Sequence, residues 1–277
     1  MTVGKSDALL CANAVSYAYQ SVPVISDVTV TAKSGDCIGL LGPNGSGKTT
    51  LLHLLAGLIP PVSGSVELNG IKLGQLGRRA IARQLALVPQ ETALVFDYSV
   101  SEVALMGRYS HLDTFANETQ EDLDIIDQCL LVTGTLDLAN RPFSTLSGGE
   151  KQRVVIASAL AQLMPSSANS VATPDPVLLL DEPTTSLDLR YQLLIAEVLQ
   201  KLRGQRTVTL VLSTHDLNFA AGLCDQLILL REGKVIASGP TESVLTAEHV
   251  RELYGIDADI TNHQKTGRLL VVPIKEA

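Results

Sequence analysis

The stretch GPNGSGKTT, which follows the apolar segment Cys37–Leu41 and precedes a leucine-rich helical run, combines residue types that suit phosphate chemistry. Glycines let consecutive backbone N–H groups turn toward an anion, and a helix N-terminus adds partial positive charge. Lys48 can reach the β- and γ-phosphates of a nucleoside triphosphate, and the Thr49 hydroxyl can bind Mg²⁺. A glycine-rich turn that arose by chance is the alternative. The expected phosphate-binding residues are Gly42, Pro43, Asn44, Gly45, Ser46, Gly47, Lys48, Thr49 and Thr50.

An apolar run that ends in two carboxylates lies further along the chain. Val177–Leu180 contains no polar residue and is followed directly by Asp181 and Glu182. A carboxylate at the end of a buried strand can hold Mg²⁺ through its water shell, which is the role expected of Asp181. Glu182, one residue further, can polarise an attacking water. A solvated acidic turn is the alternative, and the phosphate loop in the same chain argues against it.

A second glycine pair lies in the stretch LSGGE, just before the helical run KQRVVIASALAQL. Ser147 offers a hydroxyl, and Gly148 and Gly149 offer unhindered amides at the start of that helix. Such a helix start can bind an anion, so the chain contains two stretches suited to phosphate. An ordinary glycine-rich helix cap is the alternative.

The elements that must hold these stretches follow from hydrophobic periodicity. Alternation from Ala12 to Thr31 predicts antiparallel strands joined by a turn, and the pattern becomes helical between about 99 and 162. Elsewhere strands and helices alternate, which predicts a mostly parallel sheet flanked by helices. The later strands are expected at 177–180, 208–212 and 226–230, and the helices between and after them at 189–202 and 217–223.

Composition narrows the class of protein. The formal net charge of −8 argues against a nucleic-acid binder that relies on a broad basic surface. The four cysteines have no metal-ligand spacing, which suits small buried thiols in a reducing compartment. The N-terminus has no apolar signal-peptide core, and no segment approaches the ~20 apolar residues of a membrane span. We therefore expect a soluble chain.

The order of these motifs resembles one known family. LSGGE between a phosphate loop and LLLDEP is similar to the signature of ABC ATPases, and the resemblance covers about 10–260. It implies an α/β P-loop NTPase core with a mostly parallel sheet, an N-terminal antiparallel β subdomain and an inserted α-helical subdomain. The chain would be one nucleotide-binding domain. Its expected parts are a core at 10–98 and 163–260, a helical signature subdomain at 99–162 and a C-terminal tail at 261–277.

The resemblance also implies roles for single residues in binding ATP with Mg²⁺ and hydrolysing it to ADP and phosphate. Gln90 matches the glutamine that senses Mg²⁺ and water, and His215 matches the histidine that contacts the γ-phosphate. Asp188 matches a loop that meets a partner subunit. Tyr19 resembles the aromatic residue that stacks on adenine, with Tyr17 as the rival and simple core packing as the alternative.

Partners and location follow from the same resemblance. It implies a homodimer of ATPase subunits that works with integral membrane permease subunits and, indirectly, with an external substrate-binding protein, but with no nucleic acid. The subunit would lie peripherally on the cytoplasmic face of the inner membrane. Within the family, the segment Ser99–His111 resembles the GRYPH segment of metal-chelate importers, which carry ferric siderophores, haem or cobalamin; Ser110 replaces the proline. Another importer type and a soluble ATPase of translation or DNA repair are the alternatives, and the cargo stays open.

The helical insert has one further expected role. Because it interrupts the α/β pattern, we expect residues 99–138, with Gln90 at the hinge, to receive a helix of the membrane subunit. Arg108 and Tyr109 are the candidates for that contact, and helix-end packing is the alternative. The Ser- and Pro-rich stretch 164–176 is expected to be a surface loop.

Overall fold

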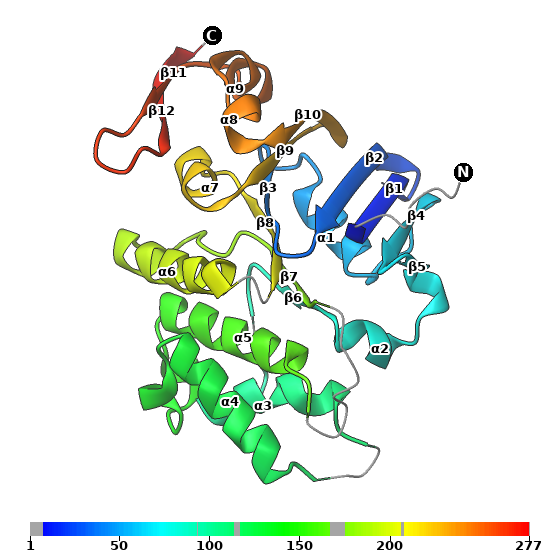
Figure 1. Cartoon of the computed structure of the whole chain (residues 1–277), viewed down its shortest axis with the longest axis vertical. Coiled ribbons are helices and arrows are strands. Elements are labelled where there is room, and N and C mark those ends of the chain that lie inside the picture. Colours follow the sequence, from blue (N-terminus) through cyan, green and yellow to red (C-terminus); the bar gives the residue numbers. More distant parts are fainter. Residues whose placement is uncertain (1–7, 93, 114–116, 167–174, 206–207, 277) are drawn as a thin grey trace. The chain divides into compact units, whose positions relative to one another are not determined.

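The computed structural model describes residues 8–92, 94–113, 117–166, 175–205 and 208–276 (Figure 1). The chain divides into two compact units, one formed by 1–75 with 209–277 and the other by 76–208. The expected helical subdomain 99–162 falls within the second unit. Most of the expected surface loop at 164–176 lies outside the described residues.

The first unit contains an antiparallel sheet near the N-terminus, as the alternating pattern predicts. Its strand order is β2-β1-β4-β5, and Ala12 of β1 pairs with Val30 on one side and Val66 on the other. Side chains such as Leu10 and Val28 are fully buried on one face of this sheet. The strands are β1 (Ala8–Tyr19), β2 (Val22–Lys33), β4 (Ser63–Leu68) and β5 (Ile71–Lys72).

The first unit also contains a run of strands in the order β10-β9-β3-β8, in which β3 is parallel to both β8 and β9. Every residue of β3 and β8 is buried, as is typical of parallel strands covered on both faces. The strands are β3 (Cys37–Leu41), β8 (Thr209–Thr214), β9 (Gln226–Arg231) and β10 (Lys234–Pro240). The helical elements of this unit are α1 (Lys48–Leu55), η1 (Leu73–Gln75), α7 (Leu217–Leu223), α8 (Thr241–Val244) and α9 (Ala247–Tyr254).

The C-terminal tail adds a feature that the sequence pattern did not indicate. Strand β11 (Ile256–Asn262) and strand β12 (Leu269–Glu276) pair as an antiparallel hairpin. Asn218 of α7 donates to the carbonyl of Val271 and accepts from its amide, which attaches the hairpin to the first unit. The tail is therefore an ordered part of that unit.

The second unit is mainly helical. Its two strands, β6 (Leu85–Val88) and β7 (Val177–Leu180), are parallel, and α3 and α4 pack on the long helix α5. Its helices are α2 (Arg78–Ala82), α3 (Val100–Met106), α4 (Gln120–Val132), α5 (Gly148–Leu163) and α6 (Leu189–Gln205), with short turns η2 (Gly107–Ser110), η3 (Leu136–Leu138) and η4 (Phe143–Thr145). The expected fold class, α/β with mostly parallel strands, N-terminal antiparallel strands and a helical insert, is confirmed. In the described part of the chain, no helix has both the length and the apolar composition needed to cross a membrane.

Local sequence explains where the helices of the second unit begin. Ser99, Thr119 and Ser147 each accept a hydrogen bond from the backbone N–H three residues later. In each case the acidic side chain at that later position accepts a hydrogen bond from the backbone N–H of the cap residue. These capping boxes satisfy amides that have no partner inside the helix.

All four cysteines are free thiols; Cys37, Cys129 and Cys224 are buried, as expected, whereas Cys11 is only partly buried. Burial raises the pKa of Cys129 to about 12, so this thiol stays protonated at neutral pH. These side chains act as small apolar packing groups.

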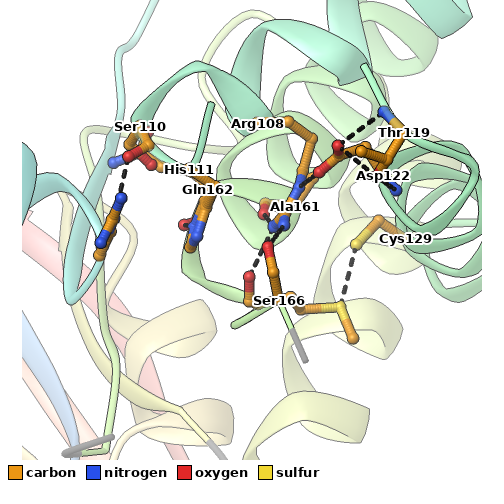
Figure 2. A network of polar contacts seen from close by, with 11 residues as sticks. Arg108, Ser110, His111, Thr119, Asp122, Cys129, Ala161, Gln162 and Ser166 are labelled. Carbon is orange, nitrogen blue, oxygen red and sulfur yellow. Dashed lines mark hydrogen bonds and ion pairs between the residues drawn. The ribbon is translucent and has the colours of Figure 1, made fainter. Parts of the chain in front are cut away.

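Arg108 corrects one expectation from the sequence. Its side chain is fully buried, and its guanidinium donates to Asp122 Oδ1 at 2.8 Å and to the carbonyls of Ala161 and Met164 (Figure 2). It also donates to Ser166 Oγ at 2.7 Å. The prediction that Arg108 contacts a membrane subunit is therefore wrong, because nothing outside the chain can reach a side chain held in this way. Tyr109, its neighbour, is 57% exposed.

The partners of Arg108 explain the ionisation of Asp122. Burial by itself raises the pKa of the Asp122 carboxyl, but hydrogen bonds from the Thr119 backbone and from Arg108 outweigh it. The pKa of Asp122 therefore lies below its ordinary value. A carboxyl with a depressed folded-state pKa contributes stability that is present above its unfolded pKa and is lost as the pH falls through the folded value.

We expect Arg108→Met to lower the free energy of unfolding by about 3–5 kcal/mol near pH 7, because it leaves a buried carboxylate without its cation. Urea unfolding measures this, with Arg79→Met, at an exposed arginine of the same unit, as the matched control. The difference from the native chain should narrow as the pH falls below about 4, where Asp122 begins to be protonated in the unfolded state. A loss below about 1 kcal/mol at pH 7 would contradict a structural role for the ion pair.

Candidate functional site

The phosphate loop holds a buried lysine between β3 and α1. Lys48 is only 6% exposed, and its Nζ donates to the carbonyl oxygens of Gly42 at 2.8 Å and Pro43 at 3.1 Å. Burying an ammonium group is costly unless polar groups surround it, and these carbonyls provide them. The loop therefore fixes one positive charge at the start of a helix.

Two of the loop glycines are required by close contacts with neighbouring strands. A Cβ on Gly42 would lie 2.2 Å from the carbonyl oxygen of Leu230. A Cβ on Gly47 would lie 2.7 Å from Ile25 Cδ1, and the φ of Gly47 is +104°, a conformation that L-residues rarely adopt. Since β2 and β9 supply these neighbours, strands from two different sheets hold the loop in its tight form.

The N-terminus of α1 has no capping side chain, as is also true of the short helices α2 and α8 in the described part of the chain. Gly47 has no side chain to cap it, and its first turn contains no acidic residue. Helices α3, α4, α5, α7 and α9 each begin at a residue whose side chain accepts a bond from a first-turn amide. Within the described residues, the buried Ser46 Oγ also has no protein hydrogen-bond partner. An uncapped helix start beside a lysine fits an anionic phosphate group.

The acid pair lies at the end of β7, in the second unit. Asp181 and Glu182 are 4% and 9% exposed, and the amide of Asp181 donates to the Val88 carbonyl at 2.9 Å. Glu182 has a φ of +43°, a strained conformation for a residue with a side chain. Thr185 Oγ1 donates to Glu182 Oε2 at 2.8 Å, which fixes the direction of the carboxylate. The sequence analysis missed Thr185, although a hydroxyl three residues after an acid at a strand end is a signal for such a bond.

A cavity of about 250 Å³ in the second unit is lined by residues from three of the predicted stretches. Gln90 and Thr92 line it from one segment, and Gly148 and Gln152 from α5. The loop after Glu182 contributes Pro183, Thr185, Ser186 and Leu187. Among the described residues, Thr92 Oγ1 and the buried Gln152 Nε2 have no protein hydrogen-bond partner. The cavity can therefore accept a polar group, and Gln90 lies on its wall.

Ser147 already has a partner within its own helix. Its Oγ donates to Glu150 Oε2 at 2.8 Å and accepts from the Glu150 amide at 3.4 Å. Hydrogen bonds from the backbone and then from the side chain of Ser147 hold the pKa of Glu150 below its usual value. The cap named as an alternative is thus present, and anion binding by Ser147, Gly148 and Gly149 stays a prediction. Gly148 is exposed and Gly149 is buried.

The remaining predicted residues are exposed side chains near element ends. His215 follows β8, and its carbonyl accepts from Tyr254 Oη at 3.4 Å. Asp188 precedes α6, and its Oδ1 accepts from the Tyr191 amide at 3.1 Å. Tyr19 is 48% exposed, and its ring meets Tyr17 edge to face at 4.9 Å between centroids. Which tyrosine stacks on adenine therefore stays open.

The predicted residues divide between the two units. The first unit contains Tyr19, the loop Gly42–Thr50 and His215. The second contains Gln90, Ser147, Gly148, Gly149, Asp181, Glu182 and Asp188. The oxygen donors expected for Mg²⁺ are the hydroxyl of Thr49, the amide oxygen of Gln90 and the carboxylate of Asp181. Hard oxygen donors of these types are the ones that Mg²⁺ prefers, so the donor set fits the metal.

Comparison with known proteins decides the family. The family model for ABC transporters matches residues 25–185, more than half of the chain. The chain belongs to the ABC transporter family. Its fold is that of the family's ATPase domain, so the resemblance found from the motifs is confirmed.

Individual relatives agree with this assignment. The chain is 39% identical to the hemin import ATP-binding protein HmuV of Bordetella bronchiseptica over 95% of its own length and 98% of the relative's. It is 36% identical to the cobalamin import ATP-binding protein BtuD of Halobacterium salinarum over 91% of its length, but spans only 60% of that relative. A solved chain described as part of an inward-facing metal-chelate type ABC transporter aligns over 97% of this chain and 98% of its own, with 29% identity and a TM-score of 0.81.

We expect Thr185→Val to lower kcat for ATP hydrolysis about tenfold with little change in KM, because a base that is no longer held in position loses part of its effect. Thr185→Ser keeps the hydroxyl and should retain most of the rate. Steady-state phosphate release, measured over a range of ATP concentrations, separates kcat from KM. Equal rates for the valine and serine variants would show that the bond to Glu182 has no catalytic role.

Proposed function

We propose that this chain is the ATP-hydrolysing subunit of an ABC importer, and that it drives uptake of an iron chelate, haem or cobalamin through separate membrane subunits. The observation that carries the proposal is Lys48, whose ammonium is buried within an uncapped glycine loop at the start of α1. That arrangement suits a nucleoside triphosphate. The cargo class is supported by the relatives, which are named for hemin and cobalamin import.

In this proposal the chain's own residues divide the chemistry between them. The loop amides and Lys48 bind the phosphates, and Thr49, Gln90 and Asp181 hold Mg²⁺, which neutralises charge on the phosphate oxygens when bound. Glu182 accepts a proton from the attacking water, and Thr185 keeps its carboxylate in one orientation. His215 contacts the γ-phosphate. Tyr19 stacks on adenine.

In the proposed assembly, two copies of this chain form a homodimer. Each subunit contributes Ser147, Gly148 and Gly149 to the nucleotide bound by its partner, and Asp188 meets the partner at the same interface. Exposed apolar side chains beside Asp188 support an interface there, since Leu189 and Leu193 are 72% and 58% exposed.

The membrane side of the proposal uses the second unit. The dimer works at the cytoplasmic face of the inner membrane, bound to permease subunits that receive cargo from an external substrate-binding protein. With Arg108 excluded, Tyr109 is the candidate contact, and the exposed Val95 and Phe96, at 92% and 70%, extend the apolar surface available in this unit.

Replacing Glu182 with glutamine should preserve ATP binding and remove nearly all turnover, a loss of about 10²–10⁴-fold, because an amide is a poor proton acceptor. The variant should accumulate as an ATP-bound dimer, which size-exclusion chromatography with ATP detects. Glu197→Gln, at an exposed carboxylate of α6, is the matched control. Retention of more than about a tenth of the native rate would remove Glu182 from the role of base.

The import function is tested by reconstituting this chain with its copurified membrane subunits in liposomes. We expect the binding protein loaded with one of the three cargo classes, tested in turn, to raise ATP hydrolysis and cargo uptake together. Lys48→Ala should abolish both, while Tyr109→Ala should reduce uptake and leave hydrolysis by the isolated subunit near the native rate. A chain that copurifies with no membrane protein, or that responds to none of the three cargoes, would overturn the proposal.

A further inference from the structure

The second glycine of LSGGE lies against an aromatic ring of the same chain. A Cβ placed on Gly149 would lie 2.3 Å from Tyr191 Cγ, 2.4 Å from Cδ1 and 2.6 Å from Cβ. Real Cβ atoms essentially never approach a heavy atom within 3.0 Å. The start of α5 and the start of α6 are therefore in contact at a point where no residue larger than glycine fits.

The backbone conformation of Gly149 does not account for the glycine. Gly149 lies in the first turn of α5 and is absent from the residues with positive φ. A glycine in a helix costs about 0.5–1 kcal/mol relative to alanine, so its presence there requires a reason. The ring of Tyr191 supplies that reason.

Tyr191 is also attached to the loop that contains Asp188. Its amide donates to Asp188 Oδ1 at 3.1 Å, and the next residue, Gln192, donates from its amide to the Asp188 carbonyl at 3.0 Å. Gln192 Nε2 donates to the carbonyl of Leu187 at 3.0 Å. Both the side chain and the backbone of this turn thus fix the loop to the start of α6.

The first glycine of the pair faces the same loop, but less tightly. A Cβ on Gly148 would lie 3.4 Å from Leu187 Cδ2, an ordinary van der Waals distance. Gly148 could therefore accept a methyl group with little disturbance, and Gly149 could not. This difference makes Gly148 the matched control for Gly149.

We propose that Tyr191 is a positioning residue, which fixes the first turn of α5 to the loop at Asp188 so that the two move as one body. The proposal rests on the proposed function, in which Ser147, Gly148 and Gly149 and the Asp188 loop act at the nucleotide. An aromatic ring suits this task because it is large and has few rotamers. Gly149 is then a glycine because Tyr191 occupies the position of its Cβ.

A double-mutant cycle tests this role in the assembled wild-type and variant subunits. Gly149→Ala should lower kcat for ATP hydrolysis at least tenfold, and Tyr191→Ala about threefold, with KM for ATP changed less than about twofold. The double variant should be no slower than Tyr191→Ala alone, because the alanine methyl then has room. Tyr191→Phe keeps the ring and should match the native rate. Any loss of rate caused by Gly148→Ala should not be recovered when Tyr191→Ala is added, because a Cβ on Gly148 would meet Leu187 and not the ring of Tyr191.

Thermal unfolding of the same variants separates packing from positioning. Gly149→Ala should lower the melting temperature, and the double variant should return to the value of Tyr191→Ala, whether or not ATP is hydrolysed. If the double variant recovers the melting temperature but not kcat, the positioning role is overturned. If the effects of Gly149→Ala and Tyr191→Ala on both quantities are independent in the double variant, the contact itself is overturned. A native chain that hydrolyses no ATP while its stability cycle behaves as expected would instead count against the proposed function.

Discussion

The candidate site depends on one electrostatic arrangement, a lysine ammonium held among backbone carbonyls at the start of a helix. Lys48 Nζ bonds to the carbonyls of Gly42 and Pro43, and α1 begins without a capping side chain or an acidic residue. The absence of a capping side chain and the absence of an acidic residue each leave the loop more positive than a capped helix start. The loop can keep this form because buried strands β3, β8 and β9 surround its base, and because close contacts at Gly42 and Gly47 prevent it from relaxing. The uncapped start of α1 is less stable by itself than a capped one, and a bound anion would restore that stability.

The same rule, that a buried charge must have partners, organises the helical unit. The guanidinium of Arg108 bonds to η2's neighbours in α4 and at the end of α5, and it joins elements that are distant in the sequence. Arg108 therefore stabilises the packing of these elements. A planar cation with several fixed donors suits four acceptors in one place, which a lysine could not satisfy with the same geometry.

Sequence reasoning succeeded where local signals act and failed where distant residues meet. The apolar run Val177–Leu180 predicted a strand with the bounds that the structure has, because a fully buried strand can contain only such residues. The hairpin of Ile256–Asn262 and Leu269–Glu276 was missed, since both strands are largely exposed and lack a clear apolar face. Arg108 was taken for a surface contact because nothing near it in the sequence shows that its partners come from 122, 161, 164 and 166. The contact between Gly149 and Tyr191 is equally invisible, whereas the types and order of the site residues were enough to indicate the family.

These contacts together make α5 a rigid connection within the second unit. The helix is 16 residues long, Tyr191 packs against its first turn, and Arg108 bonds to the carbonyl of Ala161 in its last turn. A helix held at both ends can pass a shift from one end to the other, because its backbone hydrogen bonds resist stretching along its axis. Movement of the loop at Asp188 would therefore reach η2, where Tyr109 is exposed beside the buried Arg108. Arg108 thus has an indirect part in the proposed coupling, because it holds the turn that carries the exposed Tyr109.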